Sequence, residues 1–130
     1  MIQKFQESER IFIPTTKIKN STRTLEKFIT ENFELPDNNL KQINSFIKQD
    51  MDLENLIYDL PQLIQKEVTY QKMQIKFFDE FQDDELILEI TVFSRLKIDE
   101  ILKHEDAFIH RLYEKYPEKS ADKVVIFIEG

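Results

Sequence analysis

The chain contains one glycine among its 130 residues, and that glycine is the last residue, Gly130. Tight turns and phosphate-binding loops use glycine because it adopts positive φ angles and lets a ligand approach the backbone closely. Motifs that need an interior glycine are therefore absent. They include the P-loop, the GxGxxG dinucleotide motif, the glycine-rich kinase loop, the EF-hand loop and the GxSxG nucleophile elbow.

The chain also lacks cysteine. This excludes disulfides, thiolate zinc sites, iron–sulfur clusters and cysteine nucleophiles, and it fits the reducing cytoplasm. Apolar residues make up 41% of the chain and charged residues 33%, which is typical of a folded globular protein. No apolar run approaches the roughly 20 residues of a membrane helix, so we expect a cytoplasmic protein without a membrane segment.

Helical periodicity dominates the first half of the chain. Residues 1–20 show no clear period, and we expect them to form an irregular N-terminal arm. Residues 21–33 repeat apolar side chains at steps of three and four, which predicts a helix, and a second helix should end near Lys48. A third helix should follow a cap at Asp52. Pro61 predicts a kink or a fresh start within it, because proline lacks the N–H that the helix needs.

The period then changes from 3.6 to 2. In residues 73–78 and 86–93 an apolar side chain recurs at every second position, and the positions between are mostly polar, which predicts two strands joined by the acidic connection 79–85. A long helix over about residues 97–116 follows. Its predicted inward face is Ile98, Ile101, Leu102, Phe108, Ile109 and Leu112. The consecutive apolar residues 124–128 are typical of a strand buried on both faces.

These elements predict a single α+β domain over residues 1–130. It would comprise the arm, a helical part over 21–69 and a ββαβ part over 70–130, with a small antiparallel-rich sheet packed on helices. If the long helix runs back along the sheet, the final strand is parallel to the second and could lie beside the first. The sequence leaves its position open.

Four short segments of the second half form a series: LP at 60–61, FFDE at 77–80, DDELILEI at 83–90 and IDE at 98–100. With the final short strand, this series resembles a family of small uncharacterised prokaryotic proteins over residues 56–130. The resemblance implies an αββαβ unit, and it implies no catalytic residues.

The two histidines, His104 and His110, lie in the segment HEDAFIH. A zinc-binding HExxH helix needs its second histidine four residues after the first, and Phe108 occupies that position. At 100° per residue, a spacing of six places the two imidazoles about 120° apart on a helix. We therefore interpret both histidines as surface or boundary residues of an amphipathic helix.

The acidic connection carries Asp79, Glu80, Asp83, Asp84 and Glu85. Oxygen ligands of this kind can hold a hard cation such as Ca²⁺ or Mg²⁺. The ligand spacing of an EF-hand loop is missing, however, and acidic turns also keep loops solvated and discourage edge aggregation. We predict no metal site, no cofactor and no catalytic residue.

Positive charge is concentrated near the N-terminus. Residues 1–29 contain six basic and three acidic residues, a net charge of +3, so the remaining residues carry −10 and the whole chain −7. The candidate phosphate-binding residues are Lys17, Lys19, Arg23 and Lys27. Ordinary solvated side chains explain the same pattern, and the acidic body does not favour nucleic-acid binding.

Aromatic residues carry the main functional signal. Phe78, Ile87 and Phe93 fall on the strand face opposite the main apolar set, and Phe81 lies in the acidic connection. An exposed aromatic cluster of this kind would mark a partner-binding surface. Alternatively, the N-terminal helices cover this face and the same residues belong to the core.

We therefore expect a non-enzymatic protein-interaction module that acts as a homodimer or as the acidic partner of another protein. It would use the hairpin aromatics or a free sheet edge. Small acidic antitoxins and inhibitors that neutralise a basic partner provide the analogy. The alternative is a small enzyme or ligand-binding protein with carboxylates and His104 or His110 in a helix–sheet pocket. A third hypothesis is nucleic-acid binding by the N-terminal arm.

Overall fold

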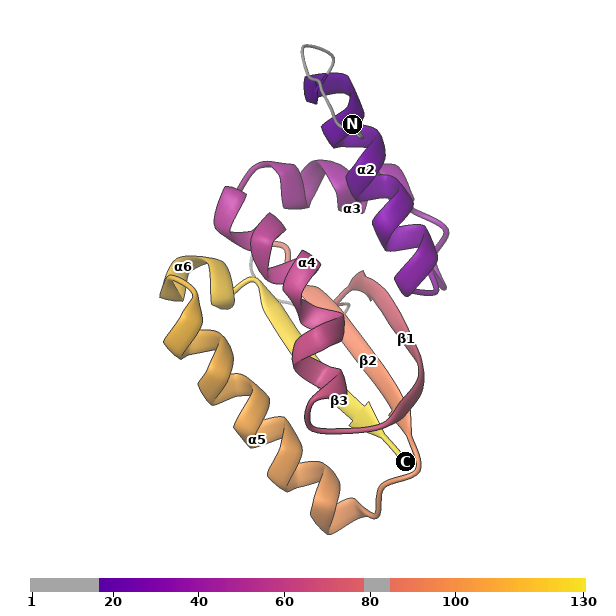
Figure 1. Ribbon diagram of the computed structural model, residues 1–130, viewed down its shortest axis with the longest axis vertical. Helices are drawn as coiled ribbons and strands as arrows, with labels where there is room; N and C mark the ends of the chain where they lie inside the picture. Colours follow the sequence, from indigo (N-terminus) through magenta and orange to yellow (C-terminus); the bar gives the residue numbers. More distant parts are fainter. Residues whose placement is uncertain (1–16, 79–84) are drawn as a thin grey trace, which may run out of the picture.

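The computed structural model describes residues 17–78 and 85–130, with side chains from Thr24 onward. Its elements are α2 (Lys17–Asn32), α3 (Leu40–Lys48), α4 (Met51–Gln65), β1 (Tyr70–Phe77), β2 (Leu88–Ser94), α5 (Ile98–Lys115), α6 (Glu118–Ala121) and β3 (Val124–Glu129). The protein is α+β, as predicted. Three helices precede a ββαβ unit, and the short α6 lies between α5 and the last strand (Figure 1).

The first described helix starts earlier than its apolar repeat. α2 begins at Lys17, so residues 17–20 are helical and do not belong to an irregular arm. Their sequence, KIKN, carries no apolar repeat, but it also contains no proline or glycine that would stop a helix. Leu25 and Ile29 are completely buried on one face of α2, and α3 contacts this helix. These side chains belong to the same apolar core as the buried residues of the sheet.

The predicted fresh helix start at Pro61 is wrong, because α4 runs without a break from Met51 to Gln65, and the alternative of a kink there stays a prediction. An interior proline removes one helix hydrogen bond and costs about 3 kcal/mol. The neighbouring side chains Ile57, Leu60 and Ile64 are at most 1% exposed. Burying each of them contributes about 1.5–3 kcal/mol, which together outweighs the cost of the proline.

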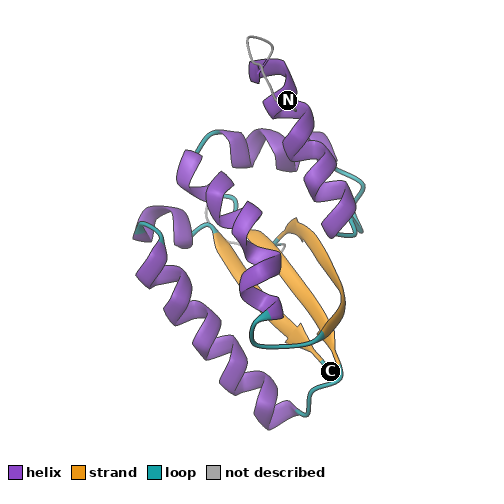
Figure 2. Ribbon diagram, in the orientation of Figure 1, coloured by secondary structure: helices purple, strands orange, loops and turns teal. Residues whose placement is uncertain are grey.

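The sheet has the order β1-β2-β3, with β1 and β2 antiparallel and β2 and β3 parallel. The parallel direction of the last strand is as expected, but this strand lies beside the second strand and not beside the first. The sheet is mixed, with one pairing of each kind, rather than antiparallel-rich (Figure 2).

A backbone bridge from another segment partly occupies the outer edge of β1. This bridge accounts for the position of β3 beside β2. The N–H of Glu34 donates to the carbonyl of Met73 at 2.8 Å, and the N–H of Ile75 donates to the carbonyl of Glu34 at 2.9 Å. The link between α2 and α3 thus forms a one-residue bridge along β1. The last strand consequently pairs with the remaining edge of β2.

One face of the sheet points into the core. The register aligns Ile75 with Ile90 and Ile90 with Ile126, and none of these side chains is more than 3% exposed. α4 lies across this side of the sheet, and α5 runs along β3 (Figure 1). The described helices therefore cover only one face of the sheet, and they do not cover the face that carries Phe93.

Half of the predicted inward face of α5 points away from the core. Phe108 and Leu112 are buried and Ile101 is half-buried, but Ile98 is 77%, Leu102 64% and Ile109 44% exposed. The helix lies beside the edge strand and contacts the body along a narrow strip. The apolar repeat predicted the helix correctly but covers a wider arc than this contact can bury.

Two strand predictions also need correction. Leu86 precedes β2 and is 48% exposed, so it does not belong to the buried strand face. β3 is an edge strand in which Phe127 is 37% exposed, so it is not buried on both faces. Its alternate residues Ile126 and Ile128 are buried, which is the pattern of a strand covered on one side.

Candidate functional site

The outer sheet face, defined by the strand residues that point away from the core, is the most aromatic surface of the sheet. The register places Phe93 between Lys72 on β1 and Glu129 on β3. The Lys72 ammonium lies 4.9 Å from the Phe93 ring centroid. Phe93 is half-buried. The outer sheet face therefore combines an aromatic centre with charges of both signs.

The β1–β2 ladder continues beyond the strand ends and adds a second aromatic group. The N–H of Phe78 donates to the carbonyl of Ile87 at 2.8 Å. The Phe78 ring stacks on Phe127 of β3, with centroids 6.3 Å apart and an interplanar angle of 29°. The structure thus brings Phe78, Ile87 and Phe93 to the face on which the sequence predicted them.

Two qualifications apply to that prediction. Phe81 lies outside the described residues. Phe127 belongs to the outer sheet face but is missing from the prediction, because the consecutive apolar residues of the last strand masked its alternation. The strand period of two could have identified it, because this period places Phe127 on the other face of the sheet from Ile126 and Ile128.

Carboxylates lie on the β2 and β3 side of the outer sheet face. Glu89 pairs with Val125 in the register, and Phe93 pairs with Glu129. The Thr91 hydroxyl donates to the Glu89 carboxylate at 3.2 Å, and Glu129 is exposed. On the same face, the register pairs Lys72 with Phe93 and Lys76 with Glu89, so the charges around the aromatic side chains are of both signs.

A second apolar surface lies on α5. The side chains of Ile98, Leu102, Ile109 and Tyr113 are 44–77% exposed, and we call this set the α5 stripe. At about 100° per residue the four positions fall within an arc of about 60°. An apolar row of this kind on one exposed helix face is unusual for a surface that meets only water.

The predicted interpretation of the histidines agrees with their positions. His104 Nδ1 lies 3.5 Å from Glu67, and Arg111 contacts the same carboxylate at 2.6 Å. The Arg111 hydrogen bond lowers the pKa of Glu67 below its ordinary value, against the opposing effect of burial. His110 is exposed and lies 4.0 Å from Asp106. Glu67 is therefore an ion-pair partner that joins the end of α4 to α5.

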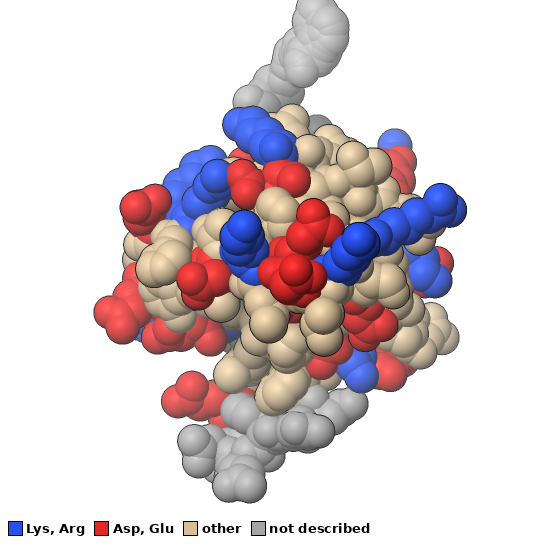
Figure 3. Space-filling model, turned by 90° about the horizontal axis from the view of Figure 1, so that it is seen from below, with Lys and Arg blue, Asp and Glu red and all other residues tan. Residues whose placement is uncertain are grey.

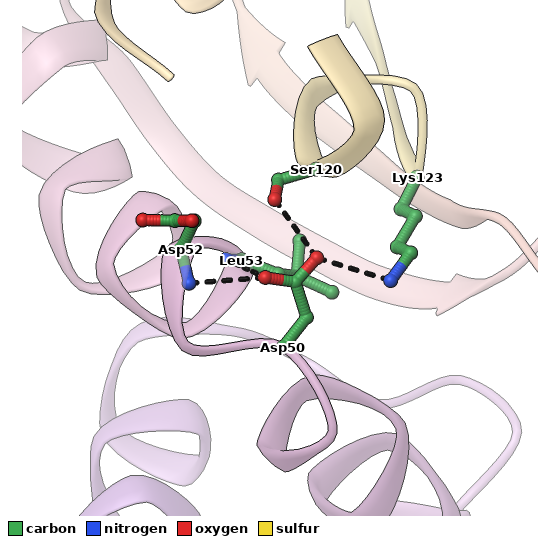
Figure 4. Close-up of polar contacts among 5 residues, drawn as sticks. All are labelled: Asp50, Asp52, Leu53, Ser120 and Lys123. Carbon is green, nitrogen blue, oxygen red and sulfur yellow. Dashed lines mark hydrogen bonds and ion pairs between the residues drawn. The ribbon is translucent and has the colours of Figure 1, made fainter. Parts of the chain in front are cut away.

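Asp50 forms another link between distant segments (Figure 4). It accepts hydrogen bonds from the N–H groups of Asp52 and Leu53, so Asp50, rather than the predicted Asp52, caps α4. Its second oxygen accepts from the Ser120 hydroxyl at 2.8 Å and from Lys123 at 3.0 Å. Burial raises the pKa of Asp50, but these hydrogen bonds outweigh burial and hold it below its ordinary value.

A hollow with a volume of about 740 Å³ lies between α3 and the end of β1. Among the described residues, its lining includes Phe46, Phe77 and Leu86, and Lys41 is the one ionisable side chain. Within the described ranges, no three His, Asp or Glu side chains form a group that could hold a metal ion. The described lining of this hollow therefore mixes apolar and polar side chains.

The predicted basic residues are only partly described. Lys17, Lys19 and Arg23 contribute their backbone to α2, and the positions of their side chains lie outside the described part of the structure. Lys27 is exposed on the same helix. On the face seen from below, basic and acidic side chains are interspersed and form no single basic patch (Figure 3).

Comparisons with protein-family models, with curated proteins and with solved structures gave no match to this chain. The resemblance of residues 56–130 to small prokaryotic proteins therefore stays a prediction. In the described part of the chain, no helix combines the length and apolarity needed to cross a bilayer.

Proposed function

We propose that this protein is a non-enzymatic interaction module of the cytoplasm that binds a basic protein partner on the outer sheet face. The observation that carries the proposal is the row formed by Phe78, Phe127 and Phe93 on a sheet face that the described helices leave uncovered. Aromatic side chains bury much area at little entropic cost and dominate many protein interfaces.

The net charge of the chain supports a basic partner. The chain as a whole carries a net charge of −7, and on the outer sheet face itself Glu89 and Glu129 lie beside Lys72 and Lys76. Opposite charge on the partner would steer the encounter and make binding sensitive to salt. An antitoxin- or inhibitor-like protein that neutralises a basic partner is the class that fits these features.

The test compares capture of the partner by matched variants. The tagged protein should retain one stoichiometric basic protein from its own cell lysate and release it as salt is raised. Phe127→Asp places a charge in the aromatic row and should reduce retention at least tenfold. Met51→Asp makes the same chemical change at a side chain that is 77% exposed at the start of α4, and it should leave retention unchanged.

Thermal unfolding of each variant checks that the fold is intact. Equal retention by the Phe127→Asp and wild-type proteins would contradict the proposal, as would the absence of any stoichiometric partner. Retention of an acidic protein would contradict the charge argument.

A further inference from the structure

The α5 stripe has a symmetric spacing. Its residues Ile98, Leu102, Ile109 and Tyr113 follow one another at steps of four, seven and four, so the spacing is the same when read in either direction. An antiparallel copy of the helix, centred between residues 105 and 106, would therefore place Ile98 opposite Tyr113 and Leu102 opposite Ile109. A row of this kind can pack against itself about a twofold axis, as isologous dimers require.

The exposed flank beside the stripe has a matching order of charges. Asp99, Lys103, Asp106 and His110 are all exposed, and at about 100° per residue they lie within an arc of about 60° next to the stripe. Read in reverse, this flank places Lys103 at the position of Asp106 and the imidazole of His110 at the position of Asp99. In an antiparallel pair, Lys103 would meet Asp106 of the second copy, and Asp99 would meet His110.

We infer that α5 is a self-association surface, on which two copies of this chain pack their α5 helices antiparallel about a twofold axis near residues 105 and 106. The apolar spacing and the charge order are independent features, and both are centred within about one residue of this point. Antiparallel packing also places the positive end of each helix dipole beside the negative end of the other.

The body of the protein contacts the stripe at Tyr113, whose hydroxyl donates to Asp122, and Ile98, Leu102 and Ile109 stay exposed. The neighbouring face of α5 carries Phe108 and Leu112, which are buried in the core, and Glu105, which accepts a hydrogen bond from β3. Docking of a second copy therefore needs no rearrangement of α5. A contact between single helices is small for a protein interface, so we expect association that depends on protein concentration rather than a permanent dimer.

This inference goes beyond the proposed function, because it uses α5 and not the outer sheet face. Variants of the two surfaces therefore test the two proposals separately. A variant of α5 that is monomeric but still binds the partner, or a variant of the outer sheet face that dimerises but no longer binds the partner, would show that the two surfaces act independently.

The first experiment measures mass against concentration by sedimentation velocity. The wild-type protein should shift from monomer to dimer as concentration rises, and Leu102→Glu should remain a monomer. Because Leu102 is 64% exposed, this variant should keep the unfolding midpoint that the wild-type protein shows at low concentration. A wild-type protein that stays monomeric at all concentrations would overturn the inference.

Charge reversal tests the antiparallel register. Lys103→Glu and Asp106→Lys should each weaken dimerisation several-fold, because each places like charges opposite one another. The double variant should recover wild-type dimerisation, since the exchanged charges are complementary again. Failure of the double variant to recover would overturn the assigned register.

Cross-linking tests the same register directly, because the chain contains no cysteine of its own. Residue 106 lies next to the proposed axis, so Asp106→Cys should form a disulfide dimer on oxidation. The two copies of residue 113 would be about 22 Å apart along the helix axes, so Tyr113→Cys alone should not cross-link. Cross-linking of both single variants would indicate parallel packing and would overturn the inference.

Discussion

The carboxylate of Glu105, in the middle of α5, accepts a hydrogen bond of 2.7 Å from the backbone N–H of Ile128 on the edge strand β3. Glu34 bridges the other edge of the sheet through its own backbone. Unpaired edge groups are templates for strand addition. Both edges of this sheet are therefore partly occupied, and the hypothesis of a free sheet edge as the partner surface loses support relative to the outer sheet face.

Replacing Glu105 should expose this edge. Glu105→Ala removes the acceptor and leaves the N–H of Ile128 without this bond, so we expect a loss of about 1–2 kcal/mol in the free energy of unfolding and faster aggregation on mild heating. Glu105→Gln keeps an oxygen acceptor and should lose less than half as much. Urea unfolding and light scattering measure the two effects, and equal stability of Glu105→Ala and wild type would contradict this role.

Asp50 should contribute to stability more than any neighbouring surface acid. Asp50→Ala removes the helix cap of α4 together with the bonds to Ser120 and Lys123, which connect segments about 70 residues apart. We expect a loss of about 1–3 kcal/mol in unfolding free energy. Asp52→Ala, an exposed change two residues away, should alter it by less than about 0.5 kcal/mol. Urea titrations of both variants check this difference.

The stability of the protein should fall in acid for an identifiable reason. The pKa values of Asp50 and Glu67 are below their ordinary values of 3.8 and 4.5. The unfolded chain then takes up protons before the folded protein does, so the stabilisation is present above about pH 4.5 and is lost as the pH falls through the folded values. Thermal unfolding from pH 7 to pH 3 should show this decline, and Glu67→Gln should make it shallower. An unchanged slope in that variant would exclude Glu67 as a cause.

Two leucines of α5 should differ in how much they contribute to the stability of the fold. Both belong to the apolar repeat, but Leu112 is 4% and Leu102 64% exposed. Leu112→Ala leaves a cavity in the core and should cost about 2–4 kcal/mol. Leu102→Ala should change the unfolding free energy by less than about 0.5 kcal/mol at low protein concentration. Similar losses in the two variants would show that the stripe is buried in solution.

Local rules predicted most of the elements. The step of three and four in α2 and α5, and the alternation in β1 and β2, depend only on which side chains need burial, so they appear in the residue order itself. The prediction of a fresh helix start at Pro61 was wrong because the local cost of a proline is visible in the sequence, whereas the burial of Ile57 and Ile64 that offsets it depends on helices and strands elsewhere in the chain.

The candidate surfaces were predictable to different extents. Phe78 and Phe93 could be assigned to the outer sheet face from the strand period alone, once two strands were recognised. The α5 stripe could not be found in this way, because buried and exposed apolar residues have the same helical spacing. Ile98 and Phe108 differ only in which of them meets the body of the protein.

The sequence by itself determined the α+β class, the change from helices to strands near residue 70, the absence of glycine- and cysteine-dependent chemistry, and the face of the sheet on which the aromatic residues lie. Those properties follow from residue types and short-range spacing. Tertiary structure alone decided that β3 lies beside β2, that Asp50 meets Lys123 and that the α5 stripe stays exposed. The reason is that strand order, long-range hydrogen bonds and helix coverage are set by competition among contacts between distant segments, which no local pattern records.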